Sequence, residues 1–290
     1  MSSAWVWSLL VVGATVLLSI AGTLLVRRLI GVEVLERHNE VAGFIYAVIG
    51  VVYAVLLGFA AITVWERYDR AQASVEQEAN DLADLYRNAE TFPSDVRIKL
   101  KDQIHDYVRL TVQKEWPSMA VGKSSAEVWD AYIQLWRTYY QFSPGTDQEK
   151  TWYSQSLTNL NDLGDQRRMR LLSGRVGSVP VMMWVALLGT GAITIAFSFL
   201  FGTPNATAQI IMSSGLAFTI ALVMVAIIAL GQPFAGITRV GHQPFDQLEG
   251  MFKYSENSPP LISNGSPHQH PLRRRWATRL ELAADKRLPL

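Results

Sequence analysis

Four stretches of this chain are apolar, uncharged and long enough to cross a lipid bilayer. They are residues 5–26, 41–64, 180–201 and 207–230, and none of them contains Asp, Glu, Lys, Arg or His. A helix needs about 20 apolar residues to cross a hydrocarbon core of about 30 Å, and each stretch meets that length. The sequence therefore predicts an all-α, multi-pass integral membrane protein with four transmembrane helices.

The four stretches form two pairs around a long polar insert. We expect a first transmembrane helix pair in residues 1–64, a helical cytosolic domain in 65–179 and a second transmembrane helix pair in 180–230. A turn-rich membrane-exit segment follows in 231–254. Residues 255–290 are rich in Ser, Pro, Asn, Gly and His and end basic, which is typical of a disordered tail. The basic end either rests on anionic lipid or stays solvated.

An even number of spans places both termini and the insert on the same side of the membrane. Arginine and lysine gather at the cytoplasmic ends of spans. On the terminus side the flanking arginines are Arg67, Arg70, Arg167, Arg168, Arg170, Arg175 and Arg239. On the other side they are Arg27, Arg28 and Arg37. The bias predicts a protein of the cell inner (plasma) membrane with cytoplasmic N- and C-termini.

The insert has the apolar periodicity of helices. No helix breaker separates Val64 from the stripe that follows it, so we expect one helix to cross the membrane border and continue to Phe92-Pro93. Ser94 is expected to cap the next helix, and Trp116-Pro117 and Gly122 should mark the break after it. Residues 124–127 fit a capping box for a third helix, and 147–173 form the last.

Composition and motifs argue against most chemistry. The chain has no cysteine, which excludes disulfides and thiolate sites. It has no P-loop, GxGxxG or HExxH motif, and its five histidines are scattered. A net charge of +1 gives no field that would attract nucleic acid. We therefore expect no catalytic residue, no metal, no cofactor and no nucleic-acid partner, and the lipid bilayer is the first partner.

The spans contain no ionisable residue, which disfavours ion-coupled transport and intramembrane catalysis. A passive pore needs none, because hydroxyls, backbone and apolar constrictions can select an ion. Hydroxyl side chains recur at four-residue spacing on the first and third spans; they are Thr15, Ser19, Thr23, Thr190, Thr194 and Ser198. They either line a water-filled path or bond neighbouring helices and their own backbone, and we favour packing.

The second span carries a stripe of small residues on one face. Its members are Gly43, Ala47, Gly50, Ala54, Gly58 and Ala61. Small residues let membrane helices approach closely, so the stripe indicates a helix–helix seam, with a pore lining as the alternative. Tyr46 and Tyr53 lie on another face, either as packing aromatics or as a polar lining.

Polar motifs border this span at both ends. His38-Asn39-Glu40 precedes it, and Trp65-Glu66-Arg67-Tyr68-Asp69 closes it. His38 and Glu40 either form an outer polar ring or cap the helix and fix its depth, and capping is the more common role. The mixed charges of the closing motif are typical of ion pairs on a solvated face.

At these borders the chain resembles the bacterial membrane proteins called bestrophin-like domain proteins, over about residues 5–250. The residues of the border motifs that carry the resemblance are His38, Asn39, Glu40, Trp65, Glu66, Tyr68, Asp69, Glu78, Pro233, Phe234 and Gly236. Bestrophins are homopentameric anion channels with four membrane helices per subunit, and bulky apolar residues of the second helix narrow their pore. The resemblance implies a homo-oligomer, a pentamer in that pattern, that conducts a small anion such as chloride.

Two features depart from bestrophins: the small-residue face of the second span, and the lack of an acidic cluster like their calcium site. A different class of function also fits, namely a non-conducting scaffold or sensor whose insert binds a partner. It is suggested by a stripe of aromatics, Trp129, Tyr132, Trp136, Tyr139 and Tyr140. In either case, we expect signals to travel between membrane and cytosol along the helix through residues 65–69.

Overall fold

The structure, a computed structural model, describes residues 2–174, 179–236 and 238–256. Four of its helices are long and apolar enough to cross a membrane. They are α1 (Ser2–Ile30), α3 (Asn39–Asn88), α8 (Val181–Ser198) and α9 (Ala206–Leu230). These helices contain the four stretches predicted from the sequence, apart from Pro180 and residues 199–201 of the third. They confirm an all-helical protein with four candidate spans.

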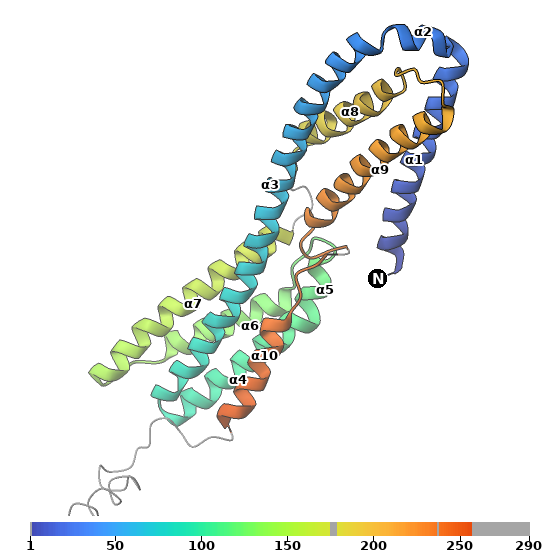
Figure 1. Cartoon of the computed structure of the whole chain (residues 1–290). Helices are drawn as coiled ribbons and strands as arrows, with labels where there is room; N and C mark the ends of the chain where they lie inside the picture. Colours follow the sequence, from blue (N-terminus) through green and yellow to red (C-terminus); the bar gives the residue numbers. More distant parts are fainter. Residues whose placement is uncertain (1, 175–178, 237, 257–290) are drawn as a thin grey trace, which may run out of the picture.

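The membrane helices associate in an order that differs from their order in the sequence. α1 packs along α9, and the apolar half of α3 packs against α8 (Figure 1). Two hydroxyls join the first of these pairs: Ser19 Oγ donates to the Ser213 carbonyl oxygen at 3.1 Å, and Thr23 Oγ1 lies 2.8 Å from Ser213 Oγ. The hydroxyl stripe of the first span is therefore used for packing, as we expected. On α8, Thr194 Oγ1 bonds its own helix at the Thr190 carbonyl oxygen.

At the end of the membrane part that lies away from the polar bundle, side chains of α1 and α3 hydrogen-bond the loop between α8 and α9. A short helix that the sequence analysis did not anticipate, α2 (Val32–Arg37), follows a break at Gly31, whose φ is 82°. The Asn39 amide donates to the Gly202 carbonyl oxygen at 2.7 Å and accepts from the Gly202 N–H at 2.9 Å. Arg27 donates to the Thr203 carbonyl oxygen at 2.6 Å and to Gln209 Oε1 at 2.7 Å. These bonds tie the loop between α8 and α9 to the first two membrane helices.

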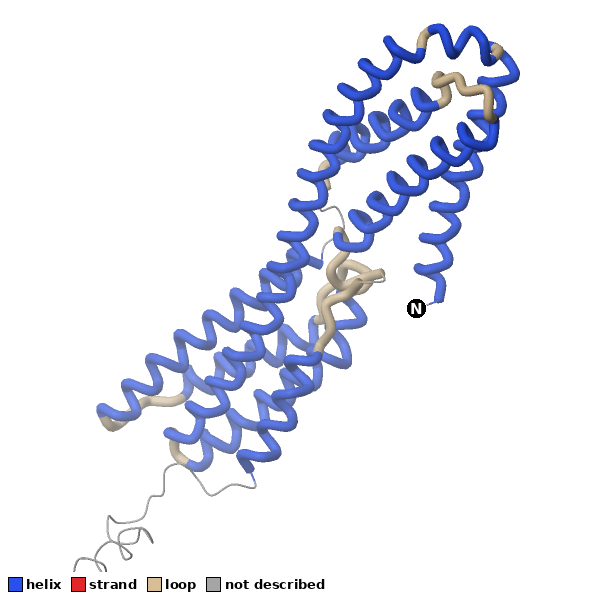
Figure 2. The backbone as a smooth tube through the Cα atoms, in the orientation of Figure 1, coloured by secondary structure: helices blue, strands red, loops and turns tan. Residues whose placement is uncertain are grey.

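The helix α3 runs without interruption through 50 residues, as predicted, and its two halves differ in composition. Its first half, to Trp65, is uncharged after Glu40, and charges begin at Glu66. At 1.5 Å per residue the helix is about 75 Å long, more than twice the hydrocarbon thickness. The charged half therefore extends into the polar bundle (Figure 2).

Four more helices pack around the charged half of α3. They are α4 (Ser94–Leu110), α6 (Ala126–Gln141), α7 (Asp147–Gly174) and α10 (Gln243–Glu256). α7 lies along α3, α4 pairs with α6, and α10 returns from the C-terminal side to contact α3 and α4. Their apolar stripes form one core, which includes Leu82, Leu85, Leu100, Ile104, Leu135, Leu160 and Phe252.

Several predicted boundaries were wrong by a short distance. The helix that begins at Ser94 does not break at Trp116-Pro117, because a π-helical segment, η2 (Thr111–Glu115), continues into α5 (Trp116–Met119). The proline lies in the first turn of α5, where its missing N–H is tolerated. The break instead falls after Met119, in the turn that contains Gly122, whose φ is 72°, so the prediction is confirmed at Gly122 only. Ser94 does not cap this helix either; Pro93 precedes it.

The cap of α6 is also one residue later than predicted. Ser125, rather than Ser124, caps this helix, and its Oγ accepts from the Val128 N–H. A 3-10 turn, η1 (Ala89–Thr91), follows the last residue of α3. Residues 255 and 256, which we placed in the tail, belong to α10, and the predicted tail from 257 to 290 lies outside the described residues.

The contact between α3 and α8 can be tested at two glycines of α8. A Cβ at Gly191 would lie 2.7 Å from the Tyr53 hydroxyl oxygen, whereas a Cβ at Gly189 would meet nothing within 4 Å. We expect Gly191→Ala to destabilise the protein by about 1–3 kcal/mol, because Tyr53 is buried and must move. Gly189→Ala should lie within about 0.5 kcal/mol of wild type. Thermal melting in detergent compares them, and equal melting temperatures would contradict the packing described.

Candidate functional site

The apolar half of α3 has one face that packs within the chain. The Tyr46 ring lies 6.0 Å from the Phe197 ring and 5.4 Å from the Phe201 ring, measured between centroids. Tyr53 is buried against Gly191 of α8. Within the described chain the two tyrosines thus pack against α8 and the segment that follows it, in line with the packing alternative.

The small-residue stripe of α3 lies on a second face, which the described chain does not cover. A Cβ built at Gly43, Gly50 or Gly58 would meet no atom within 4 Å. Ala47 and Ala54 are exposed, and only Ala61, at the bundle end, is part of the packing against α8 and α9. The stripe is thus not a seam within the subunit.

A third face of α3 carries bulky apolar side chains, and it is also uncovered. Its most exposed members are Phe44, Val48, Val51, Val55, Phe59 and Ile62. Since an α-helix turns by about 100° per residue, this bulky face lies nearly opposite Tyr46 and Tyr53, and the small-residue stripe lies about a quarter turn from them.

The outer border motif anchors the start of α3. His38 precedes the helix, and its ring Nδ1 lies 2.8 Å from the Val34 carbonyl oxygen. Asn39 makes the two bonds to Gly202 already described, and Glu40 is exposed. Asn39 therefore ties the helix start to the loop after α8, whereas the His38 side chain makes no capping hydrogen bond to α3. The choice between capping and an outer polar ring stays a prediction.

The inner border motif joins α3 to the end of α7. Arg67 Nη2 donates to the Ser173 carbonyl oxygen at 3.1 Å, and Arg70 Nε donates to the Glu66 carbonyl oxygen at 3.1 Å. Trp65, Glu66 and Asp69 are exposed, and Tyr68 is half-buried against the bundle core. The arginines of this motif thus donate to backbone carbonyls, and the ion pairs expected from the sequence stay a prediction.

Beyond this border, four charged side chains form a buried ionic cluster: Glu78 of α3, Glu115 of η2, and Arg167 and Arg170 of α7. Arg170 Nε donates to Glu78 Oε2 at 2.6 Å, and its Nη2 donates to Glu78 Oε1 at 2.9 Å and to Glu115 Oε2 at 2.7 Å. Arg167 donates to both Glu115 oxygens, at 2.5 and 3.2 Å. Glu78, Glu115 and Arg170 have no exposed surface, and Arg167 is 4% exposed.

Neutral groups supply the remaining bonds of the ionic cluster. The Tyr107 hydroxyl donates to Glu78 Oε1 at 2.7 Å, and the Ser125 N–H donates to Glu115 Oε1 at 3.3 Å. The Arg170 guanidinium lies 5.1 Å from the Trp116 ring centroid, a cation–π distance. Two carboxylates and two guanidiniums, fully bonded, form a network without net charge, which is the arrangement in which buried ions are tolerated.

The cluster holds the Glu115 carboxylate in the ionised form. Burial acts to raise the pKa of Glu115, but Arg170 and Arg167 oppose it and hold that pKa below its usual value. Burial and the neighbouring Glu78 raise the pKa of the Tyr107 hydroxyl, which therefore remains a donor. Conversely, the two carboxylates keep the pKa of Arg170 raised despite its burial.

The π-helical segment η2 is what places Glu115 in the cluster. Such segments are rare, occur mostly as short bulges within α-helices, and are often found at functional sites. Here η2 separates α4, which is packed on α6, from α5, whose Met119 Sδ lies 3.0 Å from Arg170 Nη1.

The C-terminal family motif meets the same cluster. Pro233 and Phe234 are buried, and the Phe234 ring centroid lies 5.9 Å from that of Trp116. Gly236 has a φ of 85°, a conformation that favours glycine. Phe245 of α10 lies 5.5 Å from Trp116 and is fully buried. Glu78 and the exit segment, far apart in the sequence, thus converge on Trp116 and Arg170.

Sequence reasoning missed the arginines and Glu115 of this cluster. We counted Arg167 and Arg170 among the cations that flank spans, although their charge is neutralised inside the bundle. The periodicity of the sequence did indicate that the two arginines are buried. Arg167 and Arg170 follow Leu160 and Leu163 at helical spacing, on the face that carries the buried leucines. A charge at a core position indicates a buried partner, but periodicity cannot identify that partner.

The contribution of the ionic cluster to the stability of the fold can be measured by replacing two arginines of the same helix, α7, one at a time. Arg170→Ala leaves Glu78 and Glu115 under-compensated in the core, and we expect a loss of about 3–5 kcal/mol. Arg168→Ala removes an exposed pair with Asp165 and should cost less than about 1 kcal/mol. Thermal melting of the purified proteins checks this, and the cluster is unimportant if both variants melt alike.

A further buried carboxylate, Asp81, lies outside the ionic cluster, and its pKa falls in an accessible range. Gln77 Nε2 donates to its Oδ1 at 3.0 Å, whereas its Oδ2 has no partner in the described part of the chain. Burial raises the pKa of Asp81, the Gln77 bond lowers it, and the neighbouring carboxylates, first Asp162 and then Asp84, raise it, to about 6.

This pKa predicts how stability varies with pH. Because the folded-state pKa of Asp81 lies above its unfolded value, the ionised form weakens the folded protein, so this group adds stability as pH falls from about 7 to about 4. We expect Asp81→Asn to raise the melting temperature at pH 7.5 and to leave it unchanged at pH 4. The matched variant Asp106→Asn, at an exposed pair with Arg109, should keep the wild-type pH profile. A wild-type profile in D81N would contradict the assignment.

Comparison with known proteins agrees with the resemblance found at the border motifs. Residues 13–245 match the bestrophin-like domain family, a range that includes the first membrane helix from residue 13 onward, the other three membrane helices and the ionic cluster. No curated protein and no solved structure shows significant similarity to the chain. The match covers most of the sequence, so this membrane protein belongs to the bestrophin-like domain family.

Proposed function

We propose that the chain is the subunit of a homo-oligomeric, channel-like membrane protein that passively conducts a small ion. The family favours an anion such as chloride and a pentameric assembly. The observation that carries the proposal is that α3 packs on α8 through one face and leaves its two other apolar faces uncovered within the subunit.

The order of the faces around α3 suggests how subunits meet. With α8 behind α3, the bulky face that carries Val55 and Phe59 is directed toward a shared axis. The small-residue stripe is then directed sideways, where a neighbouring α3 can approach closely. A ring of bulky apolar side chains around an axis is a hydrophobic constriction, which gates by dewetting. Thus the stripe acts as the seam between subunits, and the bulky face narrows the pore.

Charge supports a passive mechanism and one orientation. No ionisable residue lies in the four apolar stretches, so the proposed path has no site for coupling to protons or sodium. Arg167 and Arg170 are neutralised by glutamates. Of the span-flanking arginines counted on the bundle side, this leaves Arg67, Arg70, Arg168 and Arg239 among the described residues. We propose a plasma-membrane protein with cytoplasmic termini and bundle, with neither enzymatic activity nor a cofactor.

The conduction proposal is tested with two phenylalanines that are both exposed on membrane helices. Phe59→Ala should widen the proposed constriction and raise the single-channel current in planar bilayers, whereas Phe218→Ala on α9 should leave it unchanged. Ala54→Trp should separate subunits, seen by mass photometry as smaller particles. Silence of the wild type in bilayers together with monomeric particles would overturn the proposal.

A scaffold or sensor remains the second candidate, because part of the aromatic stripe of α6 is uncovered. Tyr140 is 73% exposed and Trp129 is 46% exposed, although Tyr132 and Tyr139 are buried. The Trp136 and Tyr140 rings are stacked at 5.4 Å. An oligomer that carries no current, and that captures a cytosolic protein through the bundle unless Tyr140→Ala is introduced, would favour this function.

A further inference from the structure

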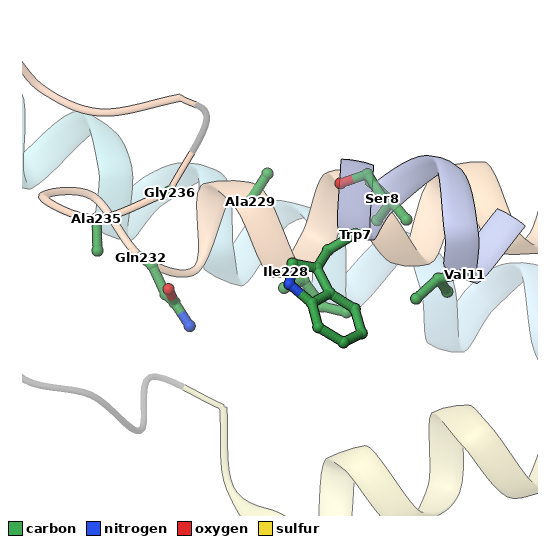
Figure 3. A pocket seen from close by; sticks show the side chains of 9 residues that line it. Trp7, Ser8, Val11, Ile228, Ala229, Gln232, Ala235 and Gly236 are labelled. Atoms are coloured by element: carbon green, nitrogen blue, oxygen red, sulfur yellow. The ribbon is translucent and has the colours of Figure 1, made fainter. Parts of the chain in front are cut away.

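The segment that joins α9 to α10 borders two hollows of different chemistry. The first is an apolar groove between α1 and α9, and the described residues that line it include no charged side chain (Figure 3). The second is a cavity of about 540 Å³ between α5 and the residues that lead into α10, and its lining includes charged side chains. Only the second hollow therefore contains groups that select a ligand by charge.

One part of the wall of this cavity is apolar. It is formed by Val112 of η2, Trp116 and Pro117 of α5, Ala120 just after α5, and Phe234. Val112 and Trp116 are half-buried, whereas Pro117 and Ala120 are exposed. A ligand that fills the cavity therefore needs an apolar body that can lie against an indole ring and aliphatic carbons.

The other part of the wall carries the charges, and it includes a cation that the chain does not use. Arg239 lines the cavity, is exposed, and makes no hydrogen bond or ion pair with the described residues. The carboxylate of the cavity, Asp246, has His242 as its neighbour instead, with 2.8 Å between Asp246 Oδ2 and His242 Nδ1. A guanidinium is thus available to bind an anion in the cavity.

Backbone bonds fix the position of Arg239 in this wall. The next residue, Val240, is buried, and its N–H donates to the Pro233 carbonyl oxygen at 2.7 Å. The Val240 carbonyl oxygen accepts from Trp116 Nε1 at 3.4 Å. Because the backbone beside Arg239 is already ordered, a ligand has less to immobilise, and this lowers the cost of binding.

The balance of charge in the cavity limits which anion it accepts. Arg239 and Asp246 contribute one charge of each sign. A polyanion such as a nucleotide or inorganic phosphate would meet a single guanidinium and a repelling carboxylate. A carboxylate has one negative charge, and its two oxygens match the paired N–H groups of a guanidinium. A bare halide would leave the apolar wall uncovered.

We propose that this cavity is a binding site for a small organic monocarboxylate. The carboxylate binds the Arg239 guanidinium, and the apolar body lies against Trp116 and Val112. The site shares Trp116 with the ionic cluster, since the Arg170 guanidinium lies 5.1 Å from the Trp116 ring centroid. A bound ligand is therefore separated from the contact between Arg170 and Glu78 by one side chain. The site depends neither on ion conduction nor on assembly of subunits.

The role of the charge is tested with 4-fluorobenzoate as the probe and the full-length protein in detergent. Fluorine-19 NMR line broadening of the probe measures its affinity, and we expect unlabelled benzoate to reverse the broadening. Arg239→Gln should weaken binding by about tenfold or more, because it removes a charge-assisted hydrogen-bond partner. Arg168→Gln is the matched control, since Arg168 is exposed on α7 and does not line the cavity. The uncharged 4-fluorobenzamide should bind weakly, and equally to wild type and Arg239→Gln.

The apolar wall is tested by filling the cavity. Ala120→Trp should abolish the broadening of 4-fluorobenzoate, and Ala126→Trp, at an exposed position outside the cavity, should retain it. Should Ala120→Trp not fold, Asp246→Asn gives a second test. It removes the repelling carboxylate, so we expect it to strengthen binding of the probe, by up to about fivefold for an exposed charge.

Several results would overturn the proposal. The first is a wild type that does not broaden the probe, or that broadens 4-fluorobenzamide as strongly, which would indicate partition into detergent. The second is equal binding in Arg239→Gln and Arg168→Gln, or in Ala120→Trp and Ala126→Trp. The third is displacement of the probe by inorganic phosphate at the concentrations at which benzoate displaces it.

Discussion

The bidentate contact between Arg170 and Glu78 is the interaction on which the polar half of this protein depends. It joins α7 to α3 at the centre of a core from which water is excluded, and it brings Glu115, Trp116 and Phe245 to the same point. Buried charges are tolerated only when their partners are present, so each element that contributes to the cluster constrains the others. The helix α3, the π-helical segment, α7 and the returning α10 are held in one arrangement for this reason.

The same contact links the bundle to the membrane. Glu78 belongs to the helix that crosses the bilayer, and an α-helix transmits displacement along its axis because its backbone bonds are continuous. The proposed constriction and Glu78 of the ionic cluster therefore lie on the same continuous helix, α3, with the border residues from 65 to 69 between them. A ligand or partner that separates the arginines from Glu78 or Glu115 has a direct mechanical path to the apolar half of α3.

The elements that follow from local rules could be predicted from the sequence. The four spans, the continuous helix from Asn39 to Asn88 and the last bundle helix required only composition, periodicity and the absence of breakers. The pairing of α1 with α9 was not predictable, since Ser19 and Ser213 are 194 residues apart and any apolar helix can pack on another. The π-helical segment was missed because it arises from the demand of the arginines for Glu115, a tertiary effect. The resemblance did point to Glu78 and Phe234, but not to the reason that they belong together.

The long separations within these contacts also have a consequence for how the protein is made. Glu78 and Arg170 are 92 residues apart, so at about 5–20 residues per second the ribosome needs about 5–18 s to supply the arginine after the glutamate. The first membrane helix waits longer, because α9 is the third span to follow it. During this interval α1 and α3 stand in the bilayer without their final neighbours, and their lack of charge lets them remain there. Because the spans are uncharged, the early membrane helices tolerate the delay before their partners are synthesised. The charged half of α3 completes its packing only after the C-terminal motif, with Phe234, has been synthesised.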